Sequence, residues 1–561
     1  MADITEVKKD AGEAKEPASR NFIETIIEDD LRTGKNTAVV TRFPPEPNGY
    51  LHIGHAKSIL LNYLTAKKYN GEFHMRFDDT NPTKEKTEFV ESILADVKWL
   101  GVDWGEHLYY ASDYFDQMYD AAVKLIKKGK AYASNLSADE IRATRGTLTE
   151  AGTNDPNRDR PIEESLQIFS DMKDGKYADG EMVLRAKIDM SSGNINMRDP
   201  ILYRVAHLTH HNTGDKWCIY PMYDFAHPIE DAIEGITYSL CTLEFEDHRP
   251  LYDWVVNEVG FEVPPRQIEF AKMYLTNVVT GKRYIKKLVE DGIVDGWDDP
   301  RLVSIAGLRR RGYTPEAIAK FIELSGISKS QSSSDYAMLE YCVREDLKTR
   351  LSRVMAVLDP IELVIDNYPD DVCEELEVAN NLENDALGSR KVSFSKHLFI
   401  ERDDFMVDPP KKYFRMFVGN EVRLMNAYFV KCTSYETDDA GRVIRVHGEY
   451  DPESRGGNSP DGRKVKGTIH WVDQKSAVNI EARLYDNIVD EEAGVYNEDG
   501  SVNVNPNSLI VMADAVAEAC VGDAKPYDSF QFVRNGFFCV DAHSKDPAKP
   551  VFNRIVALKS S

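Results

Sequence analysis

Two histidines and a glycine stand together in the run His52-Ile53-Gly54-His55. Apolar residues recur at helical spacing after this run and predict a helix over residues 52–69. The amino end of a helix presents unpaired N–H groups and a partial positive charge, so it attracts phosphate. Gly54 leaves room for a nucleotide, and His52 and His55 share a helix face from which both can donate to phosphate oxygens. Taken alone, such a pair is more often a surface or metal-binding pair, so the surrounding elements decide.

The elements around these histidines alternate between strand and helix. Residues 36–41 predict a short buried strand, and Pro44, Pro45 and Pro47 then exclude helix and require an extended loop. Residues 73–77 predict a second strand that ends at Asp78, and residues 84–100 predict a second helix. This order is typical of a parallel, doubly wound sheet, which binds ligands at the carboxyl ends of its strands. The proline-rich loop and Asp78 both fall at such ends, which favours nucleotide binding.

Length and composition narrow the class of protein. The 561 residues predict about three to five domains, and 42% hydrophobic with 29% charged residues is typical of a soluble globular chain. No apolar run reaches the length of a transmembrane helix, and we expect the polar residues 1–20 to form a disordered arm. Seven cysteines without a C-x-x-C pair disfavour a disulfide framework or a cysteine zinc site and favour the reducing cytoplasm.

The formal net charge is −25, which argues against a non-specific nucleic-acid binder. It leaves a nucleic-acid partner open, because a partner meets a local face of the protein. Residues 366–385 hold eight carboxylates and no Lys or Arg, whereas residues 411–426 hold four cations against one carboxylate. Either run could equally be solvated surface.

The pattern changes three times further along the chain. Residues 112–222 mix helical and strand-like segments and look like an insertion, and sheet-like runs return at residues 216–225 and 236–243. Residues 273–350 are mainly helical and include the basic cluster Arg309-Arg310-Arg311. Beyond residue 351, short strands split by turn residues predict barrels or sandwiches.

Several of these runs resemble class I aminoacyl-tRNA synthetases of the glutaminyl/glutamyl branch, from about residue 21 to the C-terminus. Their HIGH signature matches Phe43-Pro44-Pro45-Glu46-Pro47-Asn48-Gly49-Tyr50-Leu51-His52-Ile53-Gly54-His55, and a second shared run is Arg76-Phe77-Asp78-Asp79-Thr80-Asn81-Pro82. Resemblance to the glutaminyl members in particular is carried by Tyr220-Pro221-Met222-Tyr223-Asp224-Phe225 and Cys241-Thr242-Leu243-Glu244-Phe245.

The resemblance implies a multidomain α/β fold. A Rossmann-type catalytic domain is expected from residues 21–111 and 223–272, and an inserted acceptor-stem-binding domain from 112–222. A helical subdomain with the second signature loop is expected from 273–350, and two anticodon-binding β-barrels from 351–561.

The same resemblance implies a reaction. ATP and L-glutamine form glutaminyl-adenylate and pyrophosphate, and the glutaminyl group then passes to the 3′-terminal adenosine of tRNA-Gln. The expected partners are tRNA-Gln, L-glutamine and ATP with Mg²⁺. We expect no structural metal, no membrane contact and no obligatory protein partner, and a cytoplasmic monomer.

The resemblance places His52, His55 and Lys282 in catalytic roles on the ATP phosphates. In the second signature, Thr280 and Gly281 stand where many glutaminyl members have Met and Ser, which removes one hydroxyl contact worth about 1 kcal/mol. By residue type alone, Lys282 would be interpreted as part of a solvated basic helix face, and its position after the first signature is what favours the catalytic role. The expected ATP-binding residues are Glu46, Pro47, Asn48, His52, Ile53, Gly54, His55, Ala56, Lys57, Ser58, Thr242, Lys272, Met273, Thr280, Gly281 and Lys282.

For glutamine, Asp78 matches the residue that holds the α-ammonium, and Tyr223 matches the reader of the side-chain amide. Positions behind them are matched by Arg42, His227 and Cys241, although Cys241 is equally interpreted as a small buried hydrophobe. For tRNA, the cluster Arg309-Arg310-Arg311 is either a backbone contact or plain surface. The expected anticodon contacts are Arg353, Arg415, Arg423 and Arg534, because guanidinium groups stack on and bond to splayed bases.

Three alternatives remain open at this stage. A glutamyl-tRNA synthetase of the archaeal/eukaryotic subtype shares the first signature and differs mainly at residues 241–245. A nucleotidyltransferase without tRNA would leave the insertion and the C-terminal half unexplained. A non-enzymatic RNA-binding module is disfavoured by the retained His52, His55 and Lys282.

Overall fold

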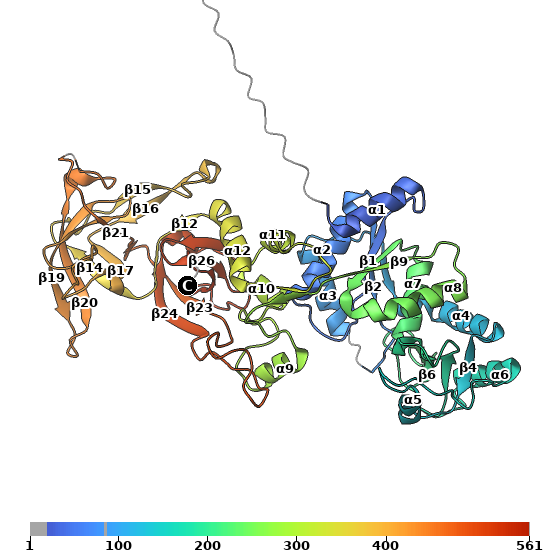
Figure 1. The fold of residues 1–561 in the computed structure, drawn as a ribbon. Coiled ribbons are helices and arrows are strands. Elements are labelled where there is room, and N and C mark those ends of the chain that lie inside the picture. Colours follow the sequence, from blue (N-terminus) through green and yellow to red (C-terminus); the bar gives the residue numbers. More distant parts are fainter. Residues whose placement is uncertain (1–19, 84–86, 460, 560–561) are drawn as a thin grey trace, which may run out of the picture.

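The computed structural model describes residues 20–83, 87–459 and 461–559. The molecule is elongated, with the N-terminal α/β part at one end and two β-sheet units in line beyond it (Figure 1). The expected arm at residues 1–20 lies, apart from Arg20, outside the described residues. Among the helices of the described residues, none combines the length and the apolar character needed to cross a membrane.

The α/β part is built on parallel strands. One set is β1 (Val40–Phe43), β2 (Glu72–Phe77) and β3 (Leu108–Tyr110), and a second is β8 (Tyr238–Thr242) with β9 (Arg266–Phe270). The two sets adjoin, because the Thr237 N–H donates to the Val40 carbonyl at 3.0 Å. The spatial order is therefore β3-β2-β1-β8-β9, which is the order of a doubly wound nucleotide-binding sheet. This confirms the predicted fold class.

The first strand begins four positions later than expected. Residues 36–41 were the predicted span, whereas β1 starts at Val40. Helix α1 (Phe22–Thr33) ends at Gly34, and the N–H groups of Lys35 and Asn36 still donate to the Asp30 carbonyl, at 2.9 and 3.3 Å. The chain is therefore still turning out of α1 where the sequence alone predicts extended backbone.

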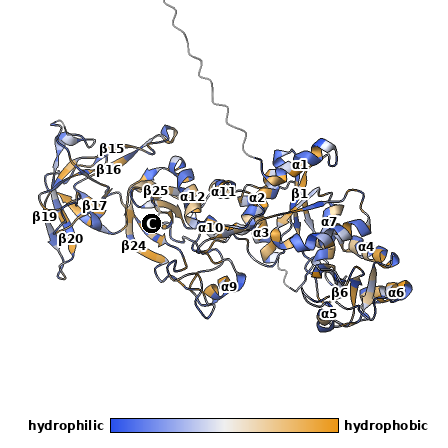
Figure 2. Ribbon diagram, viewed as in Figure 1, coloured by the Kyte–Doolittle hydropathy of each residue, from blue (hydrophilic) through white to orange (hydrophobic). Residues whose placement is uncertain are grey.

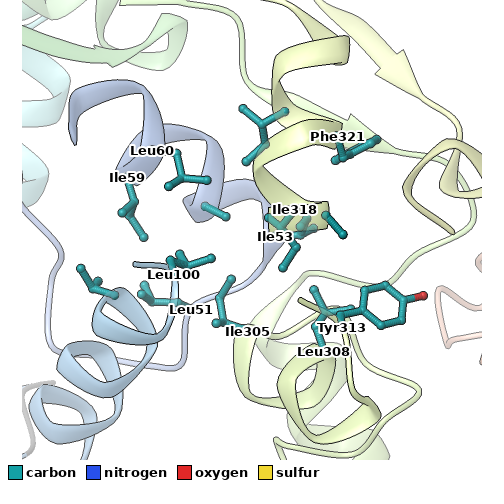
Figure 3. Packing of buried hydrophobic residues seen from close by; sticks show 14 of the residues in the cluster. Leu51, Ile53, Ile59, Leu60, Leu100, Ile305, Leu308, Tyr313, Ile318 and Phe321 are labelled. Carbon is teal, nitrogen blue, oxygen red and sulfur yellow. The ribbon is translucent and has the colours of Figure 1, made fainter. Parts of the chain in front are cut away.

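Helix α2 (Ile53–Lys68) follows β1 and carries the two histidines at its amino end. Its apolar side packs on α10 (Ile305–Arg311) and α11 (Pro315–Ser325), where Ile53, Ile305 and Ile318 meet (Figure 3). Other helices of this part are α3 (Thr87–Trp99), α7 (Tyr223–Ile233) and α8 (Arg249–Val259). The Ile53 N–H at the start of α2 donates to the Val303 carbonyl at 3.0 Å. The start of α2 is therefore fixed by a segment far along the chain, just before α10.

The insertion has a sheet and a core of its own. Its strands are β4 (Ala131–Ser134), β5 (Val183–Ala186), β6 (Ile201–Val205) and β7 (Ile219–Pro221), all antiparallel in the order β4-β5-β6-β7. Helices α4 (Phe115–Lys127), α5 (Ala138–Thr144) and α6 (Ile162–Lys173) accompany it. The prediction that the parallel sheet resumes at residues 216–225 is wrong. The strand found there, β7, belongs to the antiparallel sheet of the insertion, and it ends at Pro221 because Tyr223 already begins α7.

Between the sheet units lies a mainly helical segment. It holds α9 (Lys282–Glu290), α10, α11 and α12 (Tyr336–Arg350), together with the short parallel pair β10 (Met273–Leu275) and β11 (Ser332–Ser334). The interpretation of Arg309-Arg310-Arg311 as an RNA contact is wrong for its last two members, which are buried. Arg310 forms a two-pronged ion pair with Asp541, at 3.0 and 3.1 Å, and Arg311 donates to the Ile555 carbonyl at 3.0 Å. These arginines attach α10 to the C-terminal half.

The C-terminal half consists of two seven-stranded sheets that curl into barrel-like shapes. In the sheet nearer α10, which we call the proximal barrel, the two edge strands β12 (Arg353–Val354) and β13 (Ala356–Val357) are separated by Met355 alone. In the distal barrel, the edge strands β21 (Gly467–Ile469) and β22 (Val472–Asp473) are separated by His470 and Trp471. Because both edges of each sheet come from one short stretch of chain, each sheet must bend back on itself, as predicted.

Hydrophobic stretches lie within barrel strands such as β24 (Leu509–Ala517) (Figure 2). The distal barrel also contains β14 (Pro360–Ile365), β17 (His397–Glu401), β18 (Glu421–Leu424), β19 (Phe429–Thr437) and β20 (Val443–Asp451). The proximal barrel also contains β23 (Val478–Tyr485), β24 (Leu509–Ala517), β25 (Ser529–Phe532), β26 (Gly536–Val540) and β27 (Val551–Val556). A separate hairpin is formed by β15 (Glu374–Ala379) and β16 (Ser389–Phe394).

Candidate active site

His52 caps the amino end of α2 with its own side chain. Its Nδ1 accepts the Gly54 N–H at 3.1 Å, and His55 Nδ1 in turn accepts the His52 N–H at 3.1 Å. A side chain at position 54 would place a Cβ 2.8 Å from His52 Cε1, so glycine is what lets this cap form. Both imidazoles use Nδ1 as acceptor, and in their neutral forms both therefore carry the proton on Nε2.

The two histidines are held in their neutral forms. Burial, aided by the charges of Lys272 and Lys282, lowers the pKa of His52 to about 4. Burial also lowers the pKa of His55 well below its ordinary value, with His52 and Lys282 adding to the effect. The rings lie 4.0 Å apart between centroids. The amino end of α2 therefore presents two neutral N–H donors side by side.

The second signature loop reaches the first one directly. Lys282 is the first residue of α9, and its ammonium donates to both the side-chain and the backbone oxygen of Asn48, the latter at 3.3 Å. Asn48 in turn bonds Glu46. Glu46, Asn48, His55 and Lys282 line one cavity of about 280 Å³ together with the proline-rich loop. Two segments far apart in the sequence thus share one wall.

The unusual Gly281 has a steric reason. A Cβ at this position would lie 2.8 Å from Cδ2 of Tyr284, whose ring is covered by Arg283 at 4.5 Å and packs on Tyr496 at 4.8 Å. A serine would therefore push this aromatic group away from the loop.

A second cavity, of about 140 Å³, adjoins the first and shares Glu46 and Asn48 with it. Asp78 and Tyr223, both expected to bind glutamine, lie in its wall. Asp78 follows β2 at the carboxyl end of the sheet, and Tyr223 is the first residue of α7. In the sequence, Asp78 and Tyr223 lie on opposite sides of the insertion. The structure brings them together in one cavity at the carboxyl end of the sheet.

Asp78 is a buried carboxylate. Burial raises its pKa to about 7, and the Thr80 hydroxyl, which donates to Oδ1 at 2.8 Å, opposes this rise. No cation is among its hydrogen-bond partners within the described residues. An incoming ammonium group would supply the charge that this carboxyl needs to ionise fully.

Beneath Tyr223 lies a buried network of charged groups. The Tyr223 ring stacks on His227 with centroids 5.0 Å apart, and His227 Nε2 lies 2.6 Å from the Arg42 guanidinium. Arg42 also donates to Asp231 at 3.1 Å and to the Leu240 carbonyl at 2.9 Å. Arg42 and His227 therefore hold Tyr223 from behind. Cys241 lies on β8, and burial raises the pKa of its thiol to about 12, so it remains a neutral thiol.

Some predicted ATP residues present no side chain to these cavities. Lys57 is buried, and its ammonium donates to the Ala271 carbonyl at 3.1 Å, facing a different cavity between α2 and α11. Thr242 and Lys272 both bond Glu244, at 3.1 and 3.0 Å. Met273 is buried, and its carbonyl lies 4.0 Å from the Cβ position of Gly54. The remaining expected positions, Pro47, Ile53, Ala56, Ser58 and Thr280, lie on the two signature segments themselves.

Other lining residues were not predicted as site residues. Thr80, Asn81, Arg204 and Met222 line the same cavity as Asp78 and Tyr223. Thr80 and Asn81 belong to a run that the sequence already singles out, so a signal existed. Arg204 comes from β6 of the insertion and donates to Asn81 at 3.0 Å. No local sequence pattern predicts Arg204 as a lining residue, because its partner Asn81 is 123 positions away.

The four arginines expected at the anticodon do not form one cluster. Arg415 and Arg534 meet at the buried carboxylate of Asp404, at 3.3 and 2.6 Å, in a cavity of about 390 Å³ between the two barrels. Arg353 instead pairs with Glu383 at 2.7 Å, so the acidic run at residues 366–385 is partly neutralised by basic neighbours. Arg423 packs over the Phe429 ring at 5.3 Å.

Comparison with known proteins agrees with this geometry. Residues 38–349 match the family model of the catalytic domain of class I tRNA synthetases (E and Q). The anticodon-binding domain models of the same group match residues 352–451 and 468–541. The chain belongs to the class I tRNA synthetases of the E and Q group.

Individual relatives of the chain distinguish the glutamine from the glutamate members of this group. The glutamine–tRNA ligase of Clostridioides difficile is 58% identical over 98% of this chain and 99% of its own length. The glutamine–tRNA ligase of Clostridium perfringens is 56% identical over 97% of this chain and 98% of its own length. That of Nitrosomonas europaea is 54% identical over 96% and 98%. These relatives confirm the resemblance to the glutaminyl branch and count against the glutamyl alternative.

Proposed function

We propose that this chain ligates L-glutamine to tRNA-Gln. A glutamine carboxylate oxygen attacks the α-phosphorus of ATP and pyrophosphate leaves, which gives glutaminyl-adenylate. A hydroxyl of the 3′-terminal adenosine then attacks the activated carbonyl, loses its proton, and releases AMP. The observation that carries the proposal is the junction of the two adjoining cavities, one lined by His55 and Lys282 and the other by Asp78 and Tyr223.

Little covalent chemistry is asked of the protein in the first step. The two Nε2–H groups of His52 and His55 can donate to phosphate oxygens without carrying charge, and the Lys282 ammonium can meet the negative charge that builds up on the leaving phosphates. Mg²⁺ comes with ATP as part of the substrate, with phosphate oxygens and water as its ligands. The distribution of charge thus favours the transition state over bound ATP.

Glutamine fits the second cavity by its two ends. The Asp78 carboxylate pairs with the α-ammonium, and the Tyr223 hydroxyl accepts from the side-chain amide. Glutamate has no N–H to donate to that hydroxyl, and the single O–H of Tyr223 cannot restore the solvation that a buried carboxylate loses. The stacking of Tyr223 on His227 supports this assignment, since it limits how far the ring can turn.

The remaining parts are assigned to tRNA. The insertion at residues 112–222 lies beside the carboxyl ends of the parallel strands through the Arg204–Asn81 contact, where an acceptor end must arrive. The barrels at residues 351–561 carry Arg353, Arg415, Arg423 and Arg534 as candidate anticodon contacts. The seven cysteines are free thiols, which favours the reducing cytoplasm. A monomeric state stays a prediction.

The test is ATP–pyrophosphate exchange, measured with glutamine and with glutamate, each with and without tRNA-Gln. We expect exchange with glutamine in the presence of tRNA-Gln and far less with glutamate. Exchange that depends on glutamate instead, or charging of a different tRNA, would refute the proposal.

A further inference from the structure

We propose that Glu72, His74 and His107 form a binding site for a zinc ion at the edge of the parallel sheet opposite the candidate active site. Glu72 and His74 are two positions apart on β2 and so point to the same face of the sheet. His107 precedes β3, and its carbonyl accepts the Met75 N–H at 2.9 Å. This register puts His107 beside His74 at the amino ends of the strands, whereas Asp78 lies at their carboxyl ends.

The donor atoms are already close to a tetrahedral spacing. Glu72 Oε2 lies 3.5 Å from His74 Nε2 and 3.8 Å from His107 Nε2, and all three donor atoms lie within 4.8 Å of one another. Zinc bonds to nitrogen and oxygen are roughly 2.0–2.1 Å long, so two tetrahedral ligand atoms stand roughly 3.3–3.4 Å apart. A small inward rotation of the exposed Glu72 side chain would complete the geometry.

Both histidines are oriented by a second partner. His74 Nδ1 lies 3.3 Å from the buried Glu234 carboxylate, and His107 Nδ1 lies 3.0 Å from the Tyr109 hydroxyl. Each imidazole therefore turns its Nε2 toward Glu72. Imidazoles that bind metals are held in this way, with the second nitrogen fixed by a carboxylate or hydroxyl.

The His74 side chain is 4% exposed, and its Nε2 has no hydrogen-bond partner within the described residues. A buried polar nitrogen without a partner is rare and costly. A zinc ion would satisfy it. The rings of His74 and His107 stack with centroids 4.5 Å apart and an angle of 7° between planes, which keeps the two imidazoles side by side.

A second group of the same residue types shows what a filled hydrogen-bond network looks like. In the group Asp79, His210 and His211, His210 Nε2 lies 2.6 Å from the Asp79 carbonyl. His210 Nδ1 accepts the N–H groups of Asn212 and Thr213, at 3.1 and 3.3 Å. Both ring nitrogens of His210 are thus engaged, and this group carries no metal proposal.

The site is open to solvent and connected to the interior. The side chains of Glu72 and His107 are 59% and 37% exposed, so an ion can enter, and three protein ligands leave one position for water. On the buried side, Glu234 also pairs with Arg76 at 3.1 Å, and Arg76 pairs with Asp231 at 2.7 Å. Zinc binds the assembled site and not the unfolded chain. We therefore expect zinc to raise the stability of the folded protein.

The experiment is a titration of the metal-free full-length protein with Zn²⁺, followed by calorimetry, and with Co²⁺, followed by visible absorption. We expect one equivalent to bind, with the strong visible bands of four-coordinate Co²⁺ and a rise in Tm. His107→Gln and Glu72→Gln should each weaken binding at least tenfold. Tyr109→Phe, which removes only the group that orients His107, should weaken it by about tenfold to a hundredfold.

The matched control is His397→Gln in the distal barrel, a half-exposed histidine that pairs with Glu362 at 2.9 Å but belongs to no group of three potential metal ligands among the described residues. It should bind zinc as the unaltered protein does. Failure of the unaltered protein to bind, or equal binding by His107→Gln and His397→Gln, would overturn the proposal and leave a cluster of ion pairs. The buried His74 is not used, because its replacement can unfold the sheet.

Discussion

Lys282 and Asn48 are 234 residues apart in the chain, yet the Lys282 ammonium donates to the Asn48 backbone carbonyl at 3.3 Å. This contact joins the loop before α9 to the proline-rich loop after β1. Gly49 makes it possible, because a Cβ there would lie 2.8 Å from Lys282 Nζ. The Lys282 ammonium is therefore held at the wall of the cavity that it lines together with His55.

We predict that Lys282→Ala slows glutaminyl-adenylate formation about a hundredfold or more, which corresponds to about 3 kcal/mol of transition-state stabilisation. The KM for ATP should change far less, because the ammonium meets charge that develops only as pyrophosphate leaves. Lys286→Ala, on the exposed face of the same helix, is the control and should leave the rate unchanged. A loss confined to ATP affinity would assign Lys282 to ground-state binding.

Glutamine use should depend on pH through Asp78. Burial raises the pKa of this carboxyl to about 7 in the empty site, and only its ionised form can pair with the α-ammonium. The kcat/KM for glutamine should therefore fall as pH is lowered from 8 to 6, by up to about tenfold per unit below the pKa. His52, with a pKa of about 4, stays neutral over this range and cannot produce the effect. A flat profile would contradict the role of Asp78.

Tyr223→Phe should abolish the preference for glutamine over glutamate and most of the activity. The intact pocket should discriminate by roughly 10⁴–10⁵-fold, as sites built to bond a polar group do. Asp78→Asn should weaken both amino acids alike, since the α-ammonium is common to them. The measurement is the ratio of kcat/KM values for the two amino acids with tRNA-Gln present, and an unchanged ratio in Tyr223→Phe would remove that tyrosine from amide recognition.

Arg415 and Arg534 share Asp404 but should behave differently. Arg415 is 45% exposed in its side chain, so Arg415→Ala should weaken use of tRNA-Gln by about 1–3 kcal/mol with little change in Tm. Arg534 binds Asp404 with two nitrogens, at 2.6 and 2.7 Å, and Arg534→Ala should lower Tm clearly because it strips a buried carboxylate of its main partner. Arg415→Ala should reduce the use of a tRNA with an altered anticodon by a smaller factor. Equal effects on both tRNAs would make Arg415 a backbone contact.

Gly312→Ala should destabilise the protein more than Gly292→Ala. Both glycines have a positive φ, 100° and 68°, which L-residues adopt at a cost. Only at Gly312 would the new Cβ collide, 2.5 Å from Cβ of Cys539 and 2.8 Å from Cδ1 of Ile555. We expect a further loss of about 1–3 kcal/mol in the free energy of unfolding, measured by denaturant titration. Equal losses in the two variants would mean that α10 and the proximal barrel can shift apart enough to accommodate the new Cβ.

The parts of this molecule that sequence alone predicts are those encoded within a few residues. The helix after His52 and the carboxylate after β2 follow from periodicity and from the rules of parallel sheets. The burial of Arg310 and Arg311 does not, because a basic run looks the same whether it faces water or a carboxylate more than 200 positions away.

Asp78 and Tyr223 were both expected in one pocket and do line one cavity, whereas the groups packed behind them were only partly predicted. Arg42 and His227 were expected, but Asp231, which binds Arg42, carries no local signal. Glu72 and His74 did carry one, the alternation of a strand, yet their third member His107 lies just before a different strand, β3. Clusters assembled across strands become visible only once the register is known.

Helix α10 spans only Ile305–Arg311, so its two ends are roughly 10 Å apart. At one end, Ser304 pairs with His52 and the Ile305 N–H donates to the Leu51 carbonyl at 2.9 Å. At the other end, Arg310 and Arg311 are fixed to the proximal barrel. So short a helix cannot absorb a displacement by bending. Any tilt of the proximal barrel relative to the parallel sheet must therefore either break the Arg310–Asp541 pair or move the backbone at His52.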